Sequence, residues 1–131
     1  MIKKIKNFPL DTIDYIVHIA DIHIRNLKRH KEYKTVFKRL YADIKKRTQG
    51  KNTLIYLAGD IVHAKTDMSP ELVDLTSDFL SDISKIHPTI LIAGNHDCNL
   101  ANHSRLDALS PIVKNIKSDN KKKTIQFIKN G

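Results

Sequence analysis

Cysteine is nearly absent from this 131-residue sequence, which contains one, Cys98. A single cysteine excludes an internal disulfide framework and indicates a reducing compartment. Long hydrophobic runs are also missing: no stretch approaches the roughly 20 apolar residues of a membrane span, and no apolar signal segment follows the lysines near the amino terminus. We therefore expect an intracellular protein, cytoplasmic or nuclear, that is neither secreted nor inserted in a membrane.

The composition that remains is that of a globular protein, with 40% hydrophobic and 28% charged residues. The length fits one small domain, either a complete protein or one part of a longer fold. We expect a single domain over residues 1–131, with an amino-terminal extension at 1–14 and a basic carboxyl-terminal segment at 114–131.

The formal net charge of +9 is unevenly spread. Residues 1–50 carry 13 Lys and Arg against 5 Asp and Glu, residues 51–110 carry 4 against 8, and residues 111–131 carry 6 against 1. Basic flanks around an acidic centre suit a protein that attracts a polyanion to a site holding cations. A second interpretation, that the lysines reflect only the base composition of the genome, stays open at this point.

Three short apolar runs rich in β-branched residues lie at 15–20, 53–58 and 89–93. Such runs are typical of strands buried on both faces of a mostly parallel sheet. A fourth strand is indicated at 124–128 and a short helix at 104–113. The alternation of strands and helices predicts an α/β fold, with a mostly parallel sheet and flanking helices.

Two helices are predicted between the three apolar runs. In the first, apolar residues recur at helical spacing from Tyr33 to Ile44, and the helix should end near Gly50. In the second, Ser69 is a candidate N-cap before a proline and an apolar stripe, and Pro88 marks the end of the helix.

Each of the three runs is followed by polar residues of the kinds that bind metals or move protons. They are Asp21 and His23 after the first run, Asp60 and His63 after the second, and Asn95, His96 and Asp97 after the third. The carboxyl ends of parallel strands share one edge of the sheet, so we expect these groups to converge there. His18, inside the first run, is interpreted instead as a hydrogen-bonded core residue.

The spacing within these groups has a physical interpretation. If the strand stays extended to position 23, Asp21 and His23 point the same way, because side chains alternate with period two. Gly59 allows a sharp turn before Asp60, and Asn95 offers a neutral oxygen. These donors favour Mn, Fe, Zn or a similar ion over a thiolate site. An Asp-x-His or Gly-Asp pair alone is weak evidence; their co-occurrence with Gly-Asn-His-Asp is more specific.

The motifs ADIHI (20–24), AGDIVHAK (58–65) and AGNHDCN (93–99) resemble the first three motifs of the calcineurin-like metallophosphoesterases. The resemblance covers roughly residues 15–113. Within that superfamily, the Gly-Asp-x-x-His pattern and SRLDALSPI (104–112) are most similar to the DNA double-strand-break repair nucleases of the SbcD type.

The resemblance implies the first half of an α/β/β/α sandwich and a site for two divalent metal ions, commonly Mn, with Fe, Zn or Mg as alternatives. It assigns one ion to Asp21 and His23, a bridging role to Asp60 and the second ion to Asn95. By the same resemblance His96 acts on the phosphate or the leaving oxygen, with Asp97 orienting its imidazole. His63 would contact the scissile phosphate.

The sequence departs from the family pattern after residue 103, because no histidine follows and three expected metal ligands are absent. We expect the chain to be either the amino-terminal part of a longer enzyme or a shortened member of the family. Enzyme activity is therefore uncertain at this stage, and weak metal binding by the isolated chain is expected.

Three functions remain open: an SbcD-like DNA exonuclease, a non-catalytic relic that binds nucleic acid or a partner, and a phosphomonoesterase or cyclic-nucleotide phosphodiesterase. The expected partner is DNA. The resemblance adds a coiled-coil ATPase subunit, and homo-oligomerisation is an alternative way to complete the fold.

Overall fold

The fold described here is that of a computed structural model, which describes residues 8–24, 29–62, 69–92, 112–114 and 125–128. The elements in chain order are β1 (Tyr15–Ile19), α1 (His30–Arg47), β2 (Thr53–Leu57), α2 (Pro70–Ile86), β3 (Thr89–Ile92) and β4 (Ile125–Ile128). The four strands pair in the order β1-β2-β3-β4, and every pair is parallel. The predicted α/β fold with a parallel sheet and flanking helices is therefore confirmed.

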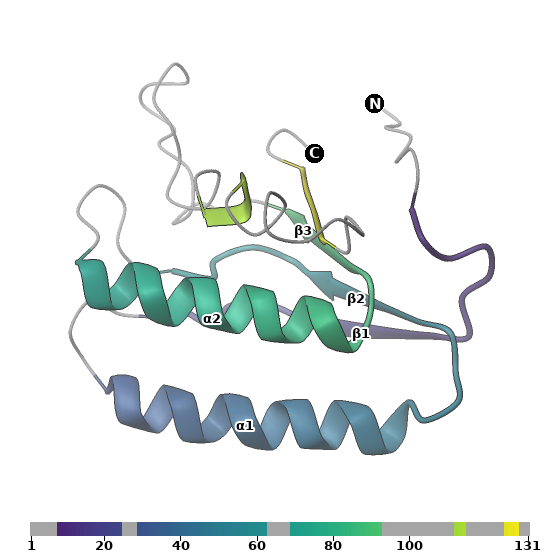
Figure 1. Ribbon diagram of the computed structural model, residues 1–131, viewed down its shortest axis with the longest axis horizontal. Coiled ribbons are helices and arrows are strands. Elements are labelled where there is room, and N and C mark those ends of the chain that lie inside the picture. The colour runs from purple at the N-terminus through teal and green to yellow at the C-terminus, as the bar shows by residue number, and fades with distance from the viewer. Residues whose placement is uncertain (1–7, 25–28, 63–68, 93–111, 115–124, 129–131) are drawn as a thin grey trace.

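Both long helices lie side by side on the same face of the sheet (Figure 1). This placement follows from the strand order: each crossover moves one strand further in the same direction, and right-handed crossovers then put both helices on one side. Because parallel strands all point the same way, the carboxyl ends of β1 and β2 meet at one sheet edge. That edge is where the polar residues that follow β1 and β2 are placed.

The ends of the helices follow the local sequence. The Ser69 side chain accepts a hydrogen bond from the Leu72 backbone N–H at 3.1 Å, as predicted for an N-cap, and Pro70 begins α2. At the carboxyl end of α1, the Thr48 N–H donates to the Ile44 carbonyl, and Gly50 takes a left-handed φ of 73°. Among the residues that the structure describes, no helix is long and apolar enough to cross a bilayer.

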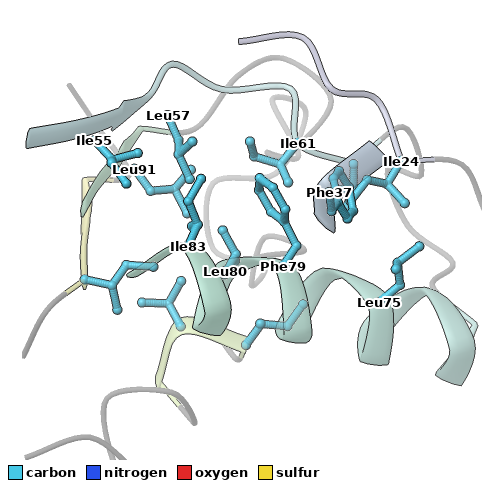
Figure 2. Close-up of a cluster of buried hydrophobic side chains, with 14 of the residues drawn as sticks. Ile24, Phe37, Ile55, Leu57, Ile61, Leu75, Phe79, Leu80, Ile83 and Leu91 are labelled. Atoms are coloured by element: carbon cyan, nitrogen blue, oxygen red, sulfur yellow. The ribbon is translucent and has the colours of Figure 1, made fainter. Parts of the chain in front are cut away.

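The core lies between the sheet and the two helices (Figure 2). Leu57 and Leu91 are neighbours across β2 and β3, and both are completely buried beneath α2. Phe79 on α2 is 1% exposed, and its ring lies 4.4 Å from that of Phe37 on α1. This contact joins the two helices through the core, near the middle of α2.

The first strand corrects one prediction. β1 is an edge strand that pairs with β2 alone among the described strands, and it is not buried on both faces: Ile16 is 62% exposed. His18, interpreted as a core residue, is exposed, with its ring 5.2 Å from that of Tyr56. Both residues alternate with Val17, which packs on the core, and so face away from the helices. An apolar run identifies a strand but not its position in the sheet.

His87, the residue that ends α2, links helix packing to pH. The Thr48 hydroxyl donates to the Ile44 carbonyl at 2.6 Å, so its oxygen is left to accept from His87 Nε2 at 2.7 Å. Burial of the ring lowers the pKa of His87 from the ordinary value of 6.5. The unfolded chain therefore binds a proton at this residue more readily than the folded chain does.

We expect His87 to make the free energy of unfolding fall as pH drops below about 6.5, because protonation then favours the unfolded state. Urea unfolding at pH 7.5 and pH 5.5 should show a smaller loss of stability in His87→Gln than in the wild type. His18→Gln, the same change at an exposed histidine, is the control. Equal losses in all three proteins would show that His87 does not contribute.

Candidate metal centre

Beyond β1 and β2 the chain continues as two irregular segments, residues 20–24 and 58–62, that run side by side. Three backbone hydrogen bonds join them: Asp21 N–H to Gly59 O at 3.3 Å, His23 N–H to Asp60 O at 2.9 Å, and Ile24 N–H to Ile61 O at 2.8 Å. A fourth runs from Ala58 N–H to the carbonyl of Ile19, the last residue of β1, at 2.8 Å. The pairing of the two strands therefore extends past their ends, and it fixes the two polar motifs relative to each other.

Apolar side chains anchor the far ends of both segments. Ile24 forms a parallel bridge with Val62, and Ile24, Ile61 and Val62 are all completely buried. Figure 2 shows Ile24 and Ile61 among the core side chains that include Phe37 and Phe79. Each polar motif thus lies between a regular strand and a buried isoleucine or valine. These three buried residues inside the motifs ADIHI and AGDIV explain how an irregular backbone is held in place.

The backbone at the polar residues is left-handed, which corrects the expectation of continued extension. The φ angles are 57° at Asp21, 52° at His23, 53° at Asp60 and 91° at Gly59. The turn expected at Gly59 is present, but Asp21 and His23 do not converge by strand alternation. Positive φ is uncommon for residues other than glycine, with Asn, Asp and His enriched among the exceptions. Such conformations cluster at functional sites, where the surrounding structure maintains them.

Asp21, His23 and Asp60 nevertheless come together. His23 Nε2 lies 3.6 Å from Asp21 Oδ1 and 4.0 Å from Asp60 Oδ2, and one donor atom from each residue falls within 4.8 Å of the others. The Asp21 side chain is 73% exposed, that of His23 32% and that of Asp60 20%. The three donors therefore line a site that is partly buried on the Asp60 side and open to solvent on the Asp21 side.

These distances fit a divalent cation. Donor atoms that share an ion at about 2.1 Å lie about 3–4 Å from one another, and both distances from His23 Nε2 fall in that range. Two carboxylates and an imidazole form a nitrogen and oxygen donor set without thiolate, which suits Mn, Fe, Zn and related ions. The two negative charges would offset the charge of the ion. The donors present therefore fit a metal centre by both spacing and chemistry.

The other predicted site residues, His63, Asn95, His96 and Asp97, lie outside the residues that the structure describes. The structure thus places three of the seven predicted residues and brings those three together. The roles of the remaining four stay predictions that rest on the resemblance.

One residue near the site was not recognised from the sequence. Tyr33, in the first turn of α1, donates its hydroxyl to the backbone carbonyl of His23 at 2.8 Å. The sequence places Tyr33 in the apolar stripe of the helix, where its ring does pack against the core. The available signal was the residue type, because a partly buried tyrosine usually finds a partner for its hydroxyl.

Comparison with known proteins adds two findings. The sequence profile described as "Calcineurin-like phosphoesterase" matches residues 15–130. The chain is also similar to the uncharacterized protein R555 of Acanthamoeba polyphaga mimivirus, with 53% identity over 112 residues. That alignment covers 86% of this chain and 8% of the viral protein, so the chain spans a small part of the length of this relative.

Proposed function

The chain belongs to the calcineurin-like phosphoesterase family of metal-dependent hydrolases, and we propose that it hydrolyses phosphodiester bonds in DNA as SbcD-like nucleases do. The observation that carries the proposal is the convergence of Asp21, His23 and Asp60 at the shared carboxyl edge of β1 and β2. The motifs most similar to the SbcD type support the choice of DNA over other phosphoesters.

The chemistry assigned to this site follows from its charges. A bound divalent cation, with Mn proposed first and Fe, Zn or Mg as alternatives, would lower the pKa of a coordinated water and neutralise charge on a phosphodiester. Asp60 is the least exposed of the three ligands, and its carboxylate can face two ions at once because it has two oxygens. Asp21 lies at the solvent side, where a long substrate can approach.

The net charge supports a polyanionic substrate. The chain carries a formal net charge of +9. Helix α1 begins beside the site, and its first turns carry the exposed residues Lys31, Lys34 and Lys38. Cations at such positions attract a phosphate backbone without reading its sequence. The binding weakens as the salt concentration rises, because the counterions released from the DNA on binding then gain less entropy. We therefore propose binding to DNA that is steeply salt-dependent.

Release of nucleotides from linear DNA should require added Mn²⁺ and stop in EDTA. His96→Ala should lower the rate by about 100-fold or more, because loss of a general acid or of a charge that stabilises the phosphate removes that order of catalysis. The assay follows acid-soluble nucleotides from end-labelled duplex DNA. His18→Ala, at an exposed position outside the triad of Asp21, His23 and Asp60, is the control and should keep the wild-type rate.

Other outcomes would select the other candidate functions. Salt-sensitive DNA binding in EDTA, without hydrolysis in any metal and unchanged by Asp60→Ala, would indicate a non-catalytic relic. Faster turnover of a phosphomonoester or a cyclic nucleotide than of DNA would indicate the third candidate. A coiled-coil ATPase partner and homo-oligomerisation stay predictions, which sedimentation of the chain with and without the partner would test.

A further inference from the structure

We propose that Tyr33 is a positioning residue of the metal centre, whose hydroxyl fixes the left-handed backbone of His23 and thereby holds the imidazole beside Asp21 and Asp60. The inference rests on the proposed function, because it takes these three residues as a cation site. It goes further by assigning to helix α1 a direct part in the geometry of that site.

Tyr33 is itself held firmly. Its backbone N–H donates to the Arg29 carbonyl at 3.0 Å in the first turn of α1. Its ring lies 5.8 Å from the ring of Phe37, which in turn lies 4.4 Å from Phe79 in the core. The Tyr33 ring is therefore packed against a line of aromatic rings that extends to α2. Its hydroxyl donates to the His23 carbonyl at 2.8 Å.

The bond matters because of the conformation of His23. With φ at 52°, this residue occupies a region of backbone angles that residues other than glycine rarely adopt. Its N–H donates to the Asp60 carbonyl at 2.9 Å, and its carbonyl accepts from Tyr33. The peptide groups on both sides of the Cα atom are therefore fixed. The first is held by the segment 58–62, and the second is held both by α1 and by that segment, because its N–H, that of Ile24, donates to the Ile61 carbonyl at 2.8 Å. Together they set the direction in which the imidazole leaves the backbone.

Loss of the hydroxyl would remove the one of these three hydrogen bonds that α1 supplies, and would leave the His23 carbonyl without it. The His23 backbone could then relax toward more populated angles, which would move Nε2 away from the carboxylates that now lie 3.6 and 4.0 Å from it. The purely structural alternative is that Tyr33 only satisfies a partly buried carbonyl. In that case its removal lowers the stability of the fold and leaves the affinity for a cation unchanged.

The test compares Tyr33→Phe with Tyr41→Phe in the full chain. Tyr41 is a matched control, because it lies eight residues further along α1, about 12 Å away, and also donates its hydroxyl to a backbone carbonyl, that of Phe79 at 3.5 Å. Mn²⁺ affinity is measured from the electron paramagnetic resonance signal of free Mn²⁺. Supporting partners of metal ligands contribute about 10-fold or more to affinity, so Tyr33→Phe should bind Mn²⁺ about 10-fold more weakly, and Tyr41→Phe as the wild type does.

Co²⁺ supplies a second readout, since its visible absorption reports coordination geometry: the spectrum should change in Tyr33→Phe and not in Tyr41→Phe. Wild-type Mn²⁺ affinity and Co²⁺ spectrum in Tyr33→Phe, with or without a loss of thermal stability, would overturn the role of Tyr33 and leave the proposed function intact. If the wild type and Asp60→Asn bind Mn²⁺ equally, or neither binds it, the triad is not a cation site and both proposals fail.

Discussion

Asp60→Asn is expected to weaken divalent-cation binding and to reduce phosphodiester hydrolysis by at least about 100-fold, because it removes the negative charge of the least exposed of the three proposed ligands. Electrostatic stabilisation of a phosphodiester by metal ions contributes several kcal/mol, and each 1.36 kcal/mol corresponds to about 10-fold in rate. Affinity is measured by calorimetric titration with Mn²⁺ and hydrolysis by release of nucleotides from linear DNA.

Asparagine is the most informative substitution for Asp60, because it removes the charge and changes little else. It has nearly the shape of aspartate and shares its tolerance of left-handed angles, so the backbone at φ 53° should be preserved. Asp43→Asn is the charge-matched control, because Asp43 is exposed on α1 and pairs with Arg47 at 2.9 Å. Exposed pairs of this kind contribute little to stability. Equal activity of Asp60→Asn and Asp43→Asn would contradict the assignment of Asp60 as a ligand.

Phe79→Ala is expected to lower the free energy of unfolding by about 3–5 kcal/mol, the usual cost of deleting a buried aromatic ring. Phe79 is 1% exposed and contacts the rings of Phe37 and Tyr41, at centroid distances of 4.4 and 6.3 Å. Its loss would leave a cavity between the two helices and the sheet. Urea unfolding followed by circular dichroism measures the change.

Val36→Ala provides the comparison on α1, because Val36 is 57% exposed and should change stability by less than about 0.5 kcal/mol. The predicted loss is a large part of the 5–15 kcal/mol that stabilises a typical domain. A loss below about 1 kcal/mol in Phe79→Ala would mean that the two helices do not depend on this aromatic contact.

Local patterns in the sequence were sufficient to predict most of the architecture. The apolar runs located the strands, and Ser69 before Pro70 located the start of α2, because a capping side chain and a proline act within one turn. The convergence of Asp21 and Asp60 also followed from a general rule, that the carboxyl ends of parallel strands share an edge.

What the sequence did not predict depends on the tertiary neighbourhood. The exposure of Ile16 and His18 reflects the edge position of β1, which no local pattern encodes. The left-handed angles at Asp21 and His23 depend on hydrogen bonds to a second segment far along the chain. The same is true of Tyr33, whose hydroxyl reaches a carbonyl that only the folded chain brings near it.

The left-handed angles at positions 21, 23 and 60 restrict which residue types can occupy these positions, independently of any metal binding. Asp, Asn, His and Gly fit such angles, whereas β-branched side chains do not. A library randomised at these positions and selected for folding alone would therefore already be enriched in the residues found here. Preference for aspartate over asparagine is the signal that would reveal selection for the cation, because the backbone scarcely distinguishes the two.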